Sequence, residues 1–218
     1  MMTRTVGLVR GFVALCALVI GMNGTAMAAA PVSAPTQHHL AKAVLAGGCF
    51  WGLEGVFEQV DGVTGVVAGY SGGSAATAHY EMTSSGTTGH AESVEITYDP
   101  ARVSYEKLLE VFFTVAHDPT TLNRQGPDAG TQYRSAIFYA DDAQKRAAQT
   151  EIASLTSAHA FGGPIVTQVV PLRAFYAAEA HHQHYMARNP YDPYILINDR
   201  PKLAALRAKF PGLVAKKG

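Results

Sequence analysis

The sequence has very little cysteine, with only Cys16 and Cys49 in 218 residues. Cys16 lies in an N-terminal segment with the features of a cleaved signal peptide, so the mature chain is expected to keep Cys49 alone. A disulfide within the mature chain is therefore excluded. A lone thiol in an oxidising compartment suggests a reactive group or an intermolecular partner. The alternative is a buried, inert cysteine.

Charge is also sparse, because only 16% of the residues are charged and 17 basic side chains balance 17 acidic ones. Loss of Arg4 and Arg10 with the signal peptide leaves a net charge of −2. This balance gives no electrostatic reason to bind nucleic acid or an anionic membrane. No segment after the signal peptide has the ~20 apolar residues that a membrane-spanning helix needs. We therefore expect no nucleic-acid partner and no membrane association after cleavage.

Residues 1–28 have the three parts of a secretory signal peptide: basic residues, an apolar run from about residue 12 to 22, and Ala26-Met27-Ala28 as a cleavage site. A lipoprotein cysteine at Cys16 is disfavoured, because Leu15 stands where a small residue is needed. We expect cleavage near Ala28 and export to the periplasm. Residues 29–41, rich in Ala, Pro and Ser, predict a flexible leader, and residues 42–218 predict one domain.

The stretch GGCFWG (47–52) contains Cys49 and the only tryptophan of the chain. Residues 42–46 before it predict a strand. Apolar residues after it recur with helical spacing at Leu53, Val56, Phe57 and Val60. Cys49 is thus expected at a helix start, where unpaired backbone N–H groups and the helix dipole lower a thiol pKa and favour thiolate. The glycines permit close approach of another molecule, and Phe50 and Trp51 add aromatic surface.

Residues 91–98 predict a strand in which Glu92 shares one face with Val94, Ile96 and Tyr98. A carboxyl group at the end of an apolar face loses its hydration, which raises its pKa. Such a group can serve as a general acid near neutral pH. The alternative is a glutamate that pairs with a buried arginine or reaches solvent from the strand end.

Strands and helices alternate along the rest of the chain. Further strands are expected at 62–70, 135–139 and 166–171. Helices are expected from a Ser104 cap to about residue 115, from an Asp141 cap to about 156, and at 179–188 and 204–210. The loop 117–133 is long, which is typical of functional or disordered segments. The pattern predicts a mixed sheet with helices packed on it, without fixing the topology.

Four motifs carry a family resemblance: GCFWG (48–52), GYSGG (69–73), GHAESV (89–94) and DAGTQYRS (128–135). In this order and spacing they resemble peptide methionine sulfoxide reductase type A, which restores one epimer of oxidised methionine. The resemblance implies an α+β fold, with a ferredoxin-like two-layer sandwich core, a mixed sheet, extra helices and a long C-terminal coil. It also implies that residues 42–218 are the catalytic domain and that no cofactor or metal is bound.

The resemblance further implies a role for each site residue. Cys49 would be the nucleophile and Glu92 the acid that protonates the sulfoxide oxygen. The polar pocket around that oxygen would be completed by Tyr80, Asp128 and Tyr133. The ε-methyl group would lie against Phe50 and Trp51. The expected activity is reduction of methionine S-sulfoxide, protein-bound and free, through a Cys49 sulfenic acid. The expected purpose is repair of oxidised proteins in the cell envelope.

The chain departs from many family members near its C-terminus, where they carry one or two further cysteines. Residues 189–199 read NPYDPYILIND, without cysteine. An external thiol must then resolve the sulfenic acid, either a small thiol or a thioredoxin-like protein. We expect the protein to be a monomer that stays free of disulfides when oxidised.

Three other functions fit parts of the sequence. A Cys-His hydrolase would use one of the nine histidines as a base for Cys49. A metal-binding module could use the cluster Glu179, His181, His182 and His184, although two histidines one helical turn apart do not close a zinc site. A polar helix face is the simpler interpretation of that cluster. The third alternative is a protein that binds oxidised peptides without turnover.

Overall fold

The computed structural model describes residues 39–215. The expected signal peptide and nearly all of the expected leader lie outside these residues. The strands of the main sheet are β1 (Ala41–Gly47), β2 (Val63–Ser71), β3 (Ala91–Tyr98), β6 (Ser135–Tyr139), β7 (Gln168–Pro171) and β8 (Phe175–Ala177). Their order is β7-β6-β1-β3-β2-β8. Only the β6–β7 pair is parallel, so the sheet is mixed. A separate hairpin joins β4 (Arg124–Gln125) and β5 (Asp128–Ala129).

The helices are mostly short. The α-helices are α1 (Phe50–Phe57), α2 (Tyr80–Thr83), α3 (Tyr105–Val111), α4 (Asp142–Ser157), α5 (Tyr185–Arg188) and α6 (Arg200–Lys209). Two π-helical turns extend or precede them, η2 (Phe112–Ala116) and η4 (Ile195–Asp199). Two 3₁₀ turns are η1 (Ala75–Thr77) and η3 (Thr131–Tyr133). Ser104 and Asp141 cap α3 and α4 through their side chains, as the sequence predicts.

Both faces of the sheet are covered. The main core joins α1, α3 and α4 to one face, through residues such as Leu45 of β1 and Ile96 of β3. A smaller cluster on the other face includes Val44, Ala46 and Phe138. The alternation of β3 places Glu92, Val94, Ile96 and Tyr98 on the core side, and each is at most 4% exposed. The expected α+β architecture with a mixed sheet is thus confirmed.

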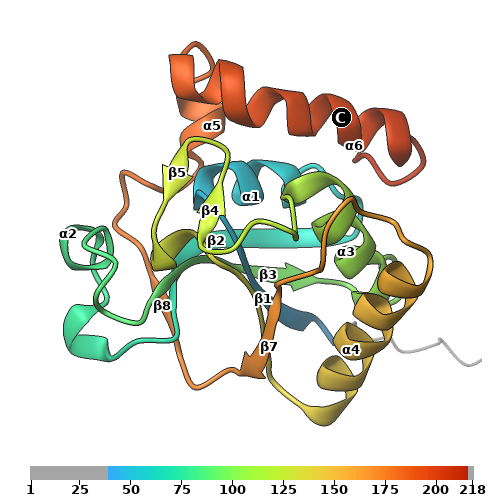
Figure 1. The fold of residues 1–218 in the computed structure, drawn as a ribbon. Coiled ribbons are helices and arrows are strands. Elements are labelled where there is room, and N and C mark those ends of the chain that lie inside the picture. The colour runs from blue at the N-terminus through green and yellow to red at the C-terminus, as the bar shows by residue number, and fades with distance from the viewer. Residues whose placement is uncertain (1–38, 216–218) are drawn as a thin grey trace, which may run out of the picture. The chain divides into compact units, whose positions relative to one another are not determined.

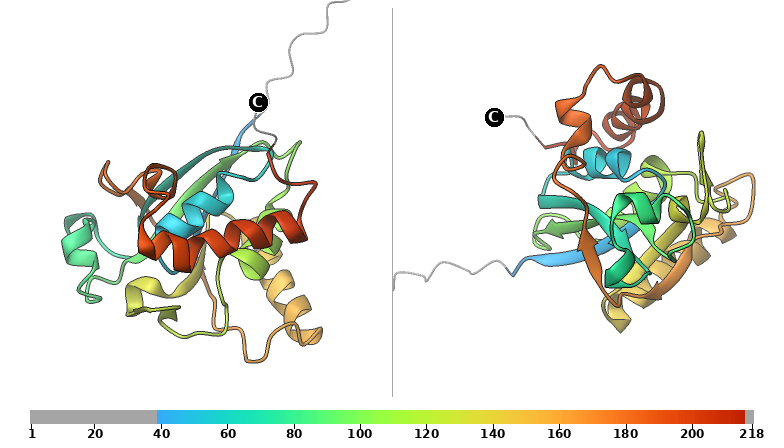
Figure 2. Two further views of the ribbon diagram at one scale, coloured as in Figure 1. Left: turned by 90° about the horizontal axis from the view of Figure 1, so that it is seen from above. Right: turned by 90° about the vertical axis from the view of Figure 1, so that its left-hand side faces the viewer.

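Helix α1 lies between the sheet and the C-terminal segment, with α6 running over its outer side (Figure 1). The same stacking is visible from a second direction in the right-hand view of Figure 2. Two glycines permit this contact. A Cβ added at Gly52 would lie 2.2 Å from Oδ1 of Asp199, and one added at Gly55 would lie 2.5 Å from Cε of Met186. Because α1 is enclosed on both sides, nearly all of its residues are buried.

The prediction of a helix over residues 179–188 is wrong for its first part. Only Tyr185–Arg188 is helical, and His184 before it has a left-handed backbone, with φ of 52°. The Gln183 side chain bonds both the N–H and the carbonyl of Ala68 at 2.9 Å, and also the carbonyl of Ala178. These tertiary hydrogen bonds determine the local conformation in place of helical periodicity.

Within residues 39–215, no helix has the length and apolar character needed to cross a membrane.

Candidate active site

Cys49 lies at the junction between β1 and α1, immediately before the first helical residue, Phe50. Because β1 is a central strand, this junction is the end of a rigid element. Gly48 makes the turn with a φ of +95°, which residues with side chains rarely adopt. An added Cβ there would also lie 2.6 Å from the Cβ of Gln125. The predicted strand, glycine turn and helix are thus present, and Cys49 is held 9% exposed.

The prediction that the thiol pKa is lowered is wrong for the resting protein. Burial raises the pKa of Cys49, and the charges of Glu92 and Asp199 raise it further. The Trp51 N–H at the helix start and the Lys202 ammonium group lower it, but by less. A helix of about two turns does not offset the lost hydration of a thiolate. At neutral pH, the resting Cys49 is therefore a protonated thiol.

Glu92 begins the core-facing side of β3, opposite Tyr70 of β2. Its Oε2 accepts a hydrogen bond of 3.1 Å from the backbone N–H of Phe50, which fixes the carboxyl group beside the start of α1. Burial raises the pKa of Glu92 to about 8; the Phe50 N–H opposes this shift and the Asp128 charge adds to it. The group is therefore protonated at neutral pH, as its position in the strand predicts. Among the described residues, no arginine or lysine pairs with it.

Three more of the predicted polar residues lie around Glu92. Tyr80 begins α2, Asp128 belongs to β5, and Tyr133 ends η3. Burial raises the pKa of both tyrosine hydroxyls, and the Glu92 and Cys49 charges contribute to each shift. Both phenols therefore remain protonated and can donate hydrogen bonds. The fold thus brings together the five polar residues that the family resemblance implies, although they come from separate segments: Cys49, Tyr80, Glu92, Asp128 and Tyr133.

The two aromatic residues after Cys49 have different environments. Phe50 is 1% exposed, with its ring 5.1 Å from the ring of His182. Trp51 is half-buried and stacks on Tyr185, with ring centroids 3.6 Å apart and planes inclined by 8°. Its Nε1 donates to Nδ1 of His182 at 3.3 Å. Trp51 therefore offers the aromatic surface at the site, while the Phe50 ring belongs largely to the core.

Cys49 also lines a cavity of about 260 Å³, together with Tyr194, Asn198 and Lys202 of the C-terminal segment. Lys202 Nζ lies 3.0 Å from Oδ1 of Asp199, whose side chain is fully buried. This cavity gives a thiol-reactive molecule a route to the sulfur, so the low exposure of Cys49 does not seal it off. The cavity also brings a cation close to the Cys49 sulfur.

His117 lines the same cavity but is not placed to act as a base for Cys49. Its Nδ1 donates to the carbonyl of Phe112 at 2.8 Å, and its Nε2 accepts from the Ser135 hydroxyl at 2.7 Å. Burial lowers its pKa to about 4. Both ring nitrogens are occupied, and among the described residues no histidine hydrogen-bonds the Cys49 sulfur. This geometry argues against a Cys-His hydrolase.

The histidine cluster proposed as a metal module is divided among different partners. Glu179 accepts hydrogen bonds from the Tyr70 hydroxyl at 2.8 Å and the Tyr80 N–H at 2.9 Å. His182 accepts from Trp51, whereas His181 is exposed. His184 contacts α1 instead. Glu179 and His182 therefore support the aromatic side of the site and do not form a metal centre with His181 and His184.

Sequence reasoning missed Tyr194, whose hydroxyl donates to Oδ2 of Asp128. Its ring also contacts the edge of Trp51, with centroids 6.0 Å apart. The residue lies in a stretch with two prolines and no apolar period, so no local pattern indicates its position. Only the tertiary fold brings this C-terminal stretch to the active site.

Comparison with known proteins places the chain in a family. Residues 41–212 match the family model described as peptide methionine sulfoxide reductase. A relative named peptide methionine sulfoxide reductase MsrA 2 from Mesorhizobium japonicum is 54% identical over 175 residues, which cover 80% of this chain and 90% of that protein. A protein of the same name from Synechocystis is also 54% identical, over 83% of this chain and 84% of its own length.

Solved structures agree with the fold. The reduced form of Mxr1 from Saccharomyces cerevisiae is 34% identical, with a TM-score of 0.66 over 70% of this chain and 87% of that one. Methionine sulfoxide reductase A of Corynebacterium diphtheriae is 35% identical, with a TM-score of 0.63 over 73% of this chain and 80% of its own. Family model, relatives and structures agree over the segment that contains the site. The chain therefore belongs to the peptide methionine sulfoxide reductase family.

Proposed function

We propose that this oxidoreductase reduces methionine S-sulfoxide, in proteins and as the free amino acid, by attack of Cys49 with Glu92 as the acid. The observation that carries the proposal is the Phe50 N–H bond to Glu92, which places a buried, protonated carboxyl group next to the residue that bears the thiol. Turnover of each separated sulfoxide epimer with a dithiol tests the proposal. We expect only the S epimer to be consumed. Equal consumption of both epimers, or of neither, would contradict it.

The reaction can begin with both the Cys49 thiol and the Glu92 carboxyl group protonated, because its protons balance. A thiol and a sulfoxide together contain all the atoms of a sulfenic acid and a thioether, so no proton enters or leaves overall. Glu92 gives its proton to the sulfoxide oxygen as the Cys49 sulfur attacks, and the thiol proton returns to Glu92. The Tyr80 and Tyr133 hydroxyls donate hydrogen bonds to the oxygen while its charge changes. The Trp51 surface and the edge of Phe50 receive the ε-methyl group.

Regeneration requires two equivalents of an external thiol. The first attacks the Cys49 sulfenic sulfur and releases water, which leaves a mixed disulfide, and the second releases the Cys49 thiol as an external disulfide forms. Cys49 is the only cysteine among residues 39–215, which supports an external reductant of either kind, a small thiol or a thioredoxin-like protein. The cavity beside Lys202 provides access, and its cation favours an approaching thiolate.

A stoichiometric amount of substrate without reductant should leave one sulfenic acid per chain. We expect intact-mass spectrometry to show the addition of one oxygen atom, and dimedone to label Cys49 alone. Size-exclusion chromatography should show an unchanged monomer, because every Cys49 is then a sulfenic acid and no thiol remains to attack it. The same treatment of Cys49→Ser serves as the control and should give no added oxygen. A covalent dimer in the wild type would contradict direct reduction by an external thiol.

Replacement of Tyr194 by phenylalanine should lower kcat/KM by about tenfold. The variant removes the hydroxyl that bonds Asp128. A hydrogen bond to a charged group is worth about 1.5–3 kcal/mol, and a loss of ~1.4 kcal/mol lowers a rate constant tenfold. Tyr194 is a positioning residue that acts through Asp128, and the Asp128 charge helps to raise the pKa of Glu92. The pH profile of kcat should therefore also shift. Tyr191→Phe is the matched control, since Tyr191 is 83% exposed. Equal kinetics for the two variants would exclude this role.

The N-terminal sequence supports export, and we place the activity in the periplasm as repair of oxidised envelope proteins. The basic residues, apolar run and Ala26-Met27-Ala28 site carry this part of the proposal. N-terminal sequencing of the protein from a periplasmic fraction tests it. A first residue near Ala29 is expected, and an intact Met1 in the cytoplasmic fraction would contradict export.

A further inference from the structure

Three potential metal ligands lie together at the far end of α1 from Cys49. Glu54 belongs to the helix, Glu58 follows one turn later, and His184 comes from the start of α5. One ligand atom from each lies within 4.8 Å of the others. The Nδ1 atom of His184 contacts Oε1 of Glu58 and lies 3.9 Å from Oε1 of Glu54. This cluster joins two segments that are about 130 residues apart in the chain, so the sequence gives no direct sign of it.

Glu54 is the unusual member of the cluster. It is 1% exposed, and neither of its carboxylate oxygens has a side-chain hydrogen-bond partner; only the backbone N–H groups of His184 and Tyr185 lie near them. Burial raises its pKa to about 7, although the backbone N–H groups of His184 and Tyr185 oppose the shift. A buried carboxyl group without a partner is costly. Its oxygens face His184 and a second carboxylate. The hydrogen bond to Glu58 and the charges of both carboxylates raise the pKa of His184, so a protonated imidazole is the cation now between them. A divalent ion that displaces this proton would serve both carboxylates and leave the imidazole as a third ligand.

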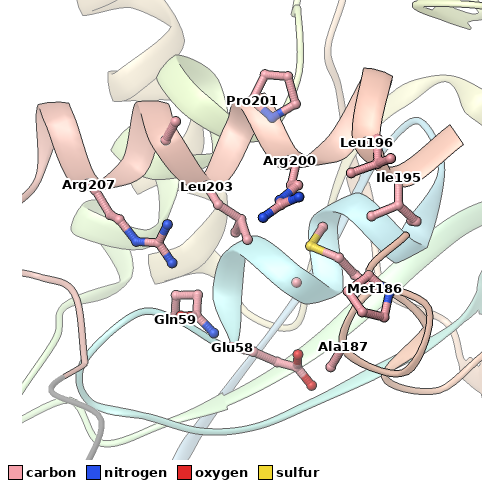
Figure 3. A pocket seen from close by; sticks show the side chains of 13 residues that line it. Glu58, Gln59, Met186, Ala187, Ile195, Leu196, Arg200, Pro201, Leu203 and Arg207 are labelled. Atoms are coloured by element: carbon pink, nitrogen blue, oxygen red, sulfur yellow. The ribbon is translucent and has the colours of Figure 1, made fainter. Parts of the chain in front are cut away.

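The other two ligands can adjust around an ion. The side chains of His184 and Glu58 are 60% and 22% exposed, so both can move and the site is open to solvent. Figure 3 shows Glu58 extending from the end of α1 toward Ala187, at the edge of a neighbouring pocket of about 620 Å³. Zinc bonds of ~2.0–2.2 Å place adjacent ligand atoms ~3.4 Å apart. The His184–Glu54 separation is near that value, and the His184–Glu58 contact needs only to open slightly.

We propose that Glu54, Glu58 and His184 bind a first-row divalent transition metal ion, with Zn²⁺ as the best match. One imidazole and two carboxylates are ligands that Zn²⁺ accepts, and an exposed fourth position can hold water. Ca²⁺ and Mg²⁺ prefer six or more oxygen ligands and do not favour an imidazole. The site is separate from the catalytic residues and does not depend on the proposed function.

A bound ion would fix α5 against α1 and so reach the aromatic side of the active site. His184 immediately precedes Tyr185, and Tyr185 stacks on Trp51. Trp51 is also the only tryptophan of the chain. Its fluorescence therefore reports on the contact between the two segments. A metal ion at this site should change that fluorescence in a saturable way.

Titration of the untagged full chain with zinc chloride in a calorimeter tests the site. We expect one Zn²⁺ per chain, and a rise in Tm of about 5–10 °C when zinc is 100-fold above its Kd. His184→Gln and Glu58→Gln should each weaken binding by at least about tenfold and remove the fluorescence change. His181→Gln is the matched control, because His181 is exposed and lies outside the cluster. It should bind zinc as the wild type does.

Three results would overturn the proposal. The first is zinc binding by His184→Gln with the same affinity as the wild type. The second is no saturable binding by the wild type below ~1 mM. The third is loss of zinc in Cys49→Ser, which would assign the ion to the Cys49 thiol. Retention of one zinc per chain in Cys49→Ser supports the proposed ligands. Because His184 is exposed and Glu58 is partly exposed, their variants are expected to fold, which circular dichroism would verify.

Discussion

Replacement of Cys49 by serine should abolish reduction of methionine sulfoxide, with kcat lowered by at least about 10⁴-fold. A serine hydroxyl has nearly the same size but is a poor nucleophile toward sulfoxide sulfur and cannot form a sulfenic acid. The measurement is dithiol-driven turnover of the S epimer, followed by the methionine formed. A Tm close to that of the wild type would show that the loss is chemical, because the substitution changes one buried atom.

Cys16→Ser is the matched control for this experiment, since Cys16 is the only other cysteine in the sequence. It should leave turnover unchanged. Residual activity of a few per cent in Cys49→Ser would mean that another group reduces the substrate. The same pair of variants also separates the enzyme from a protein that only binds oxidised peptides, because binding without turnover would survive in both.

Replacement of Glu92 by glutamine should slow the reaction by at least about 100-fold while the fold is retained, because glutamine has the shape of the acid but no proton to transfer. Wild-type activity should also fall as the pH rises through about 8, since the acid must be protonated and its pKa is raised to about 8 by burial. The variant should lack this decline. The measurement is kcat as a function of pH for both proteins.

Glu95→Gln is the control for the Glu92 variant, because Glu95 lies on the opposite face of β3 and pairs with Lys42 at 2.7 Å. It should keep near-wild-type kinetics.

The stability of Glu92→Gln gives a second measurement, and the sign of the expected change is definite. The raised pKa of folded Glu92 makes its contribution to stability fall as the pH rises from ~4.3, the ordinary value in an unfolded chain, toward about 8. Glu92→Gln should therefore be at least as stable as the wild type at pH 7. A lower Tm at that pH would mean that the carboxyl group has a structural role.

The electrostatics of Cys49 change how the reaction is initiated. A free thiolate at a helix start would react with many electrophiles, whereas this thiol is protonated and is surrounded by groups that disfavour its charge. In the proposed mechanism, activation depends on the substrate, which brings an oxygen that accepts a proton from Glu92 while the thiol loses its own. The thiol and the acid would then act as one unit, and neither pKa alone would describe the site.

Local patterns predicted the elements that hold the two proposed catalytic residues, Cys49 and Glu92. The alternation of β3 correctly placed Glu92 on the core side, and the glycine turn correctly placed Cys49 before α1. Helix spacing failed at 179–184, because Gln183 is bound to β2. The sign of the Cys49 pKa shift failed for a related reason. Burial of the thiol and the charges of Glu92 and Asp199 outweigh the helix start, and all three depend on the tertiary fold, which no local pattern shows. Tyr194 was missed for the same reason.

The residues that enclose Cys49 are separated from it by most of the chain. The thiol follows the first strand, whereas Tyr194, Asn198 and Lys202 all lie near the C-terminus. During synthesis, a nascent chain that ends before these residues would present an ordinary cysteine with a pKa of ~8.5, open to oxidants and alkylating reagents. Translation of the final helix and the turns before it thus completes the environment that keeps the Cys49 thiol protonated.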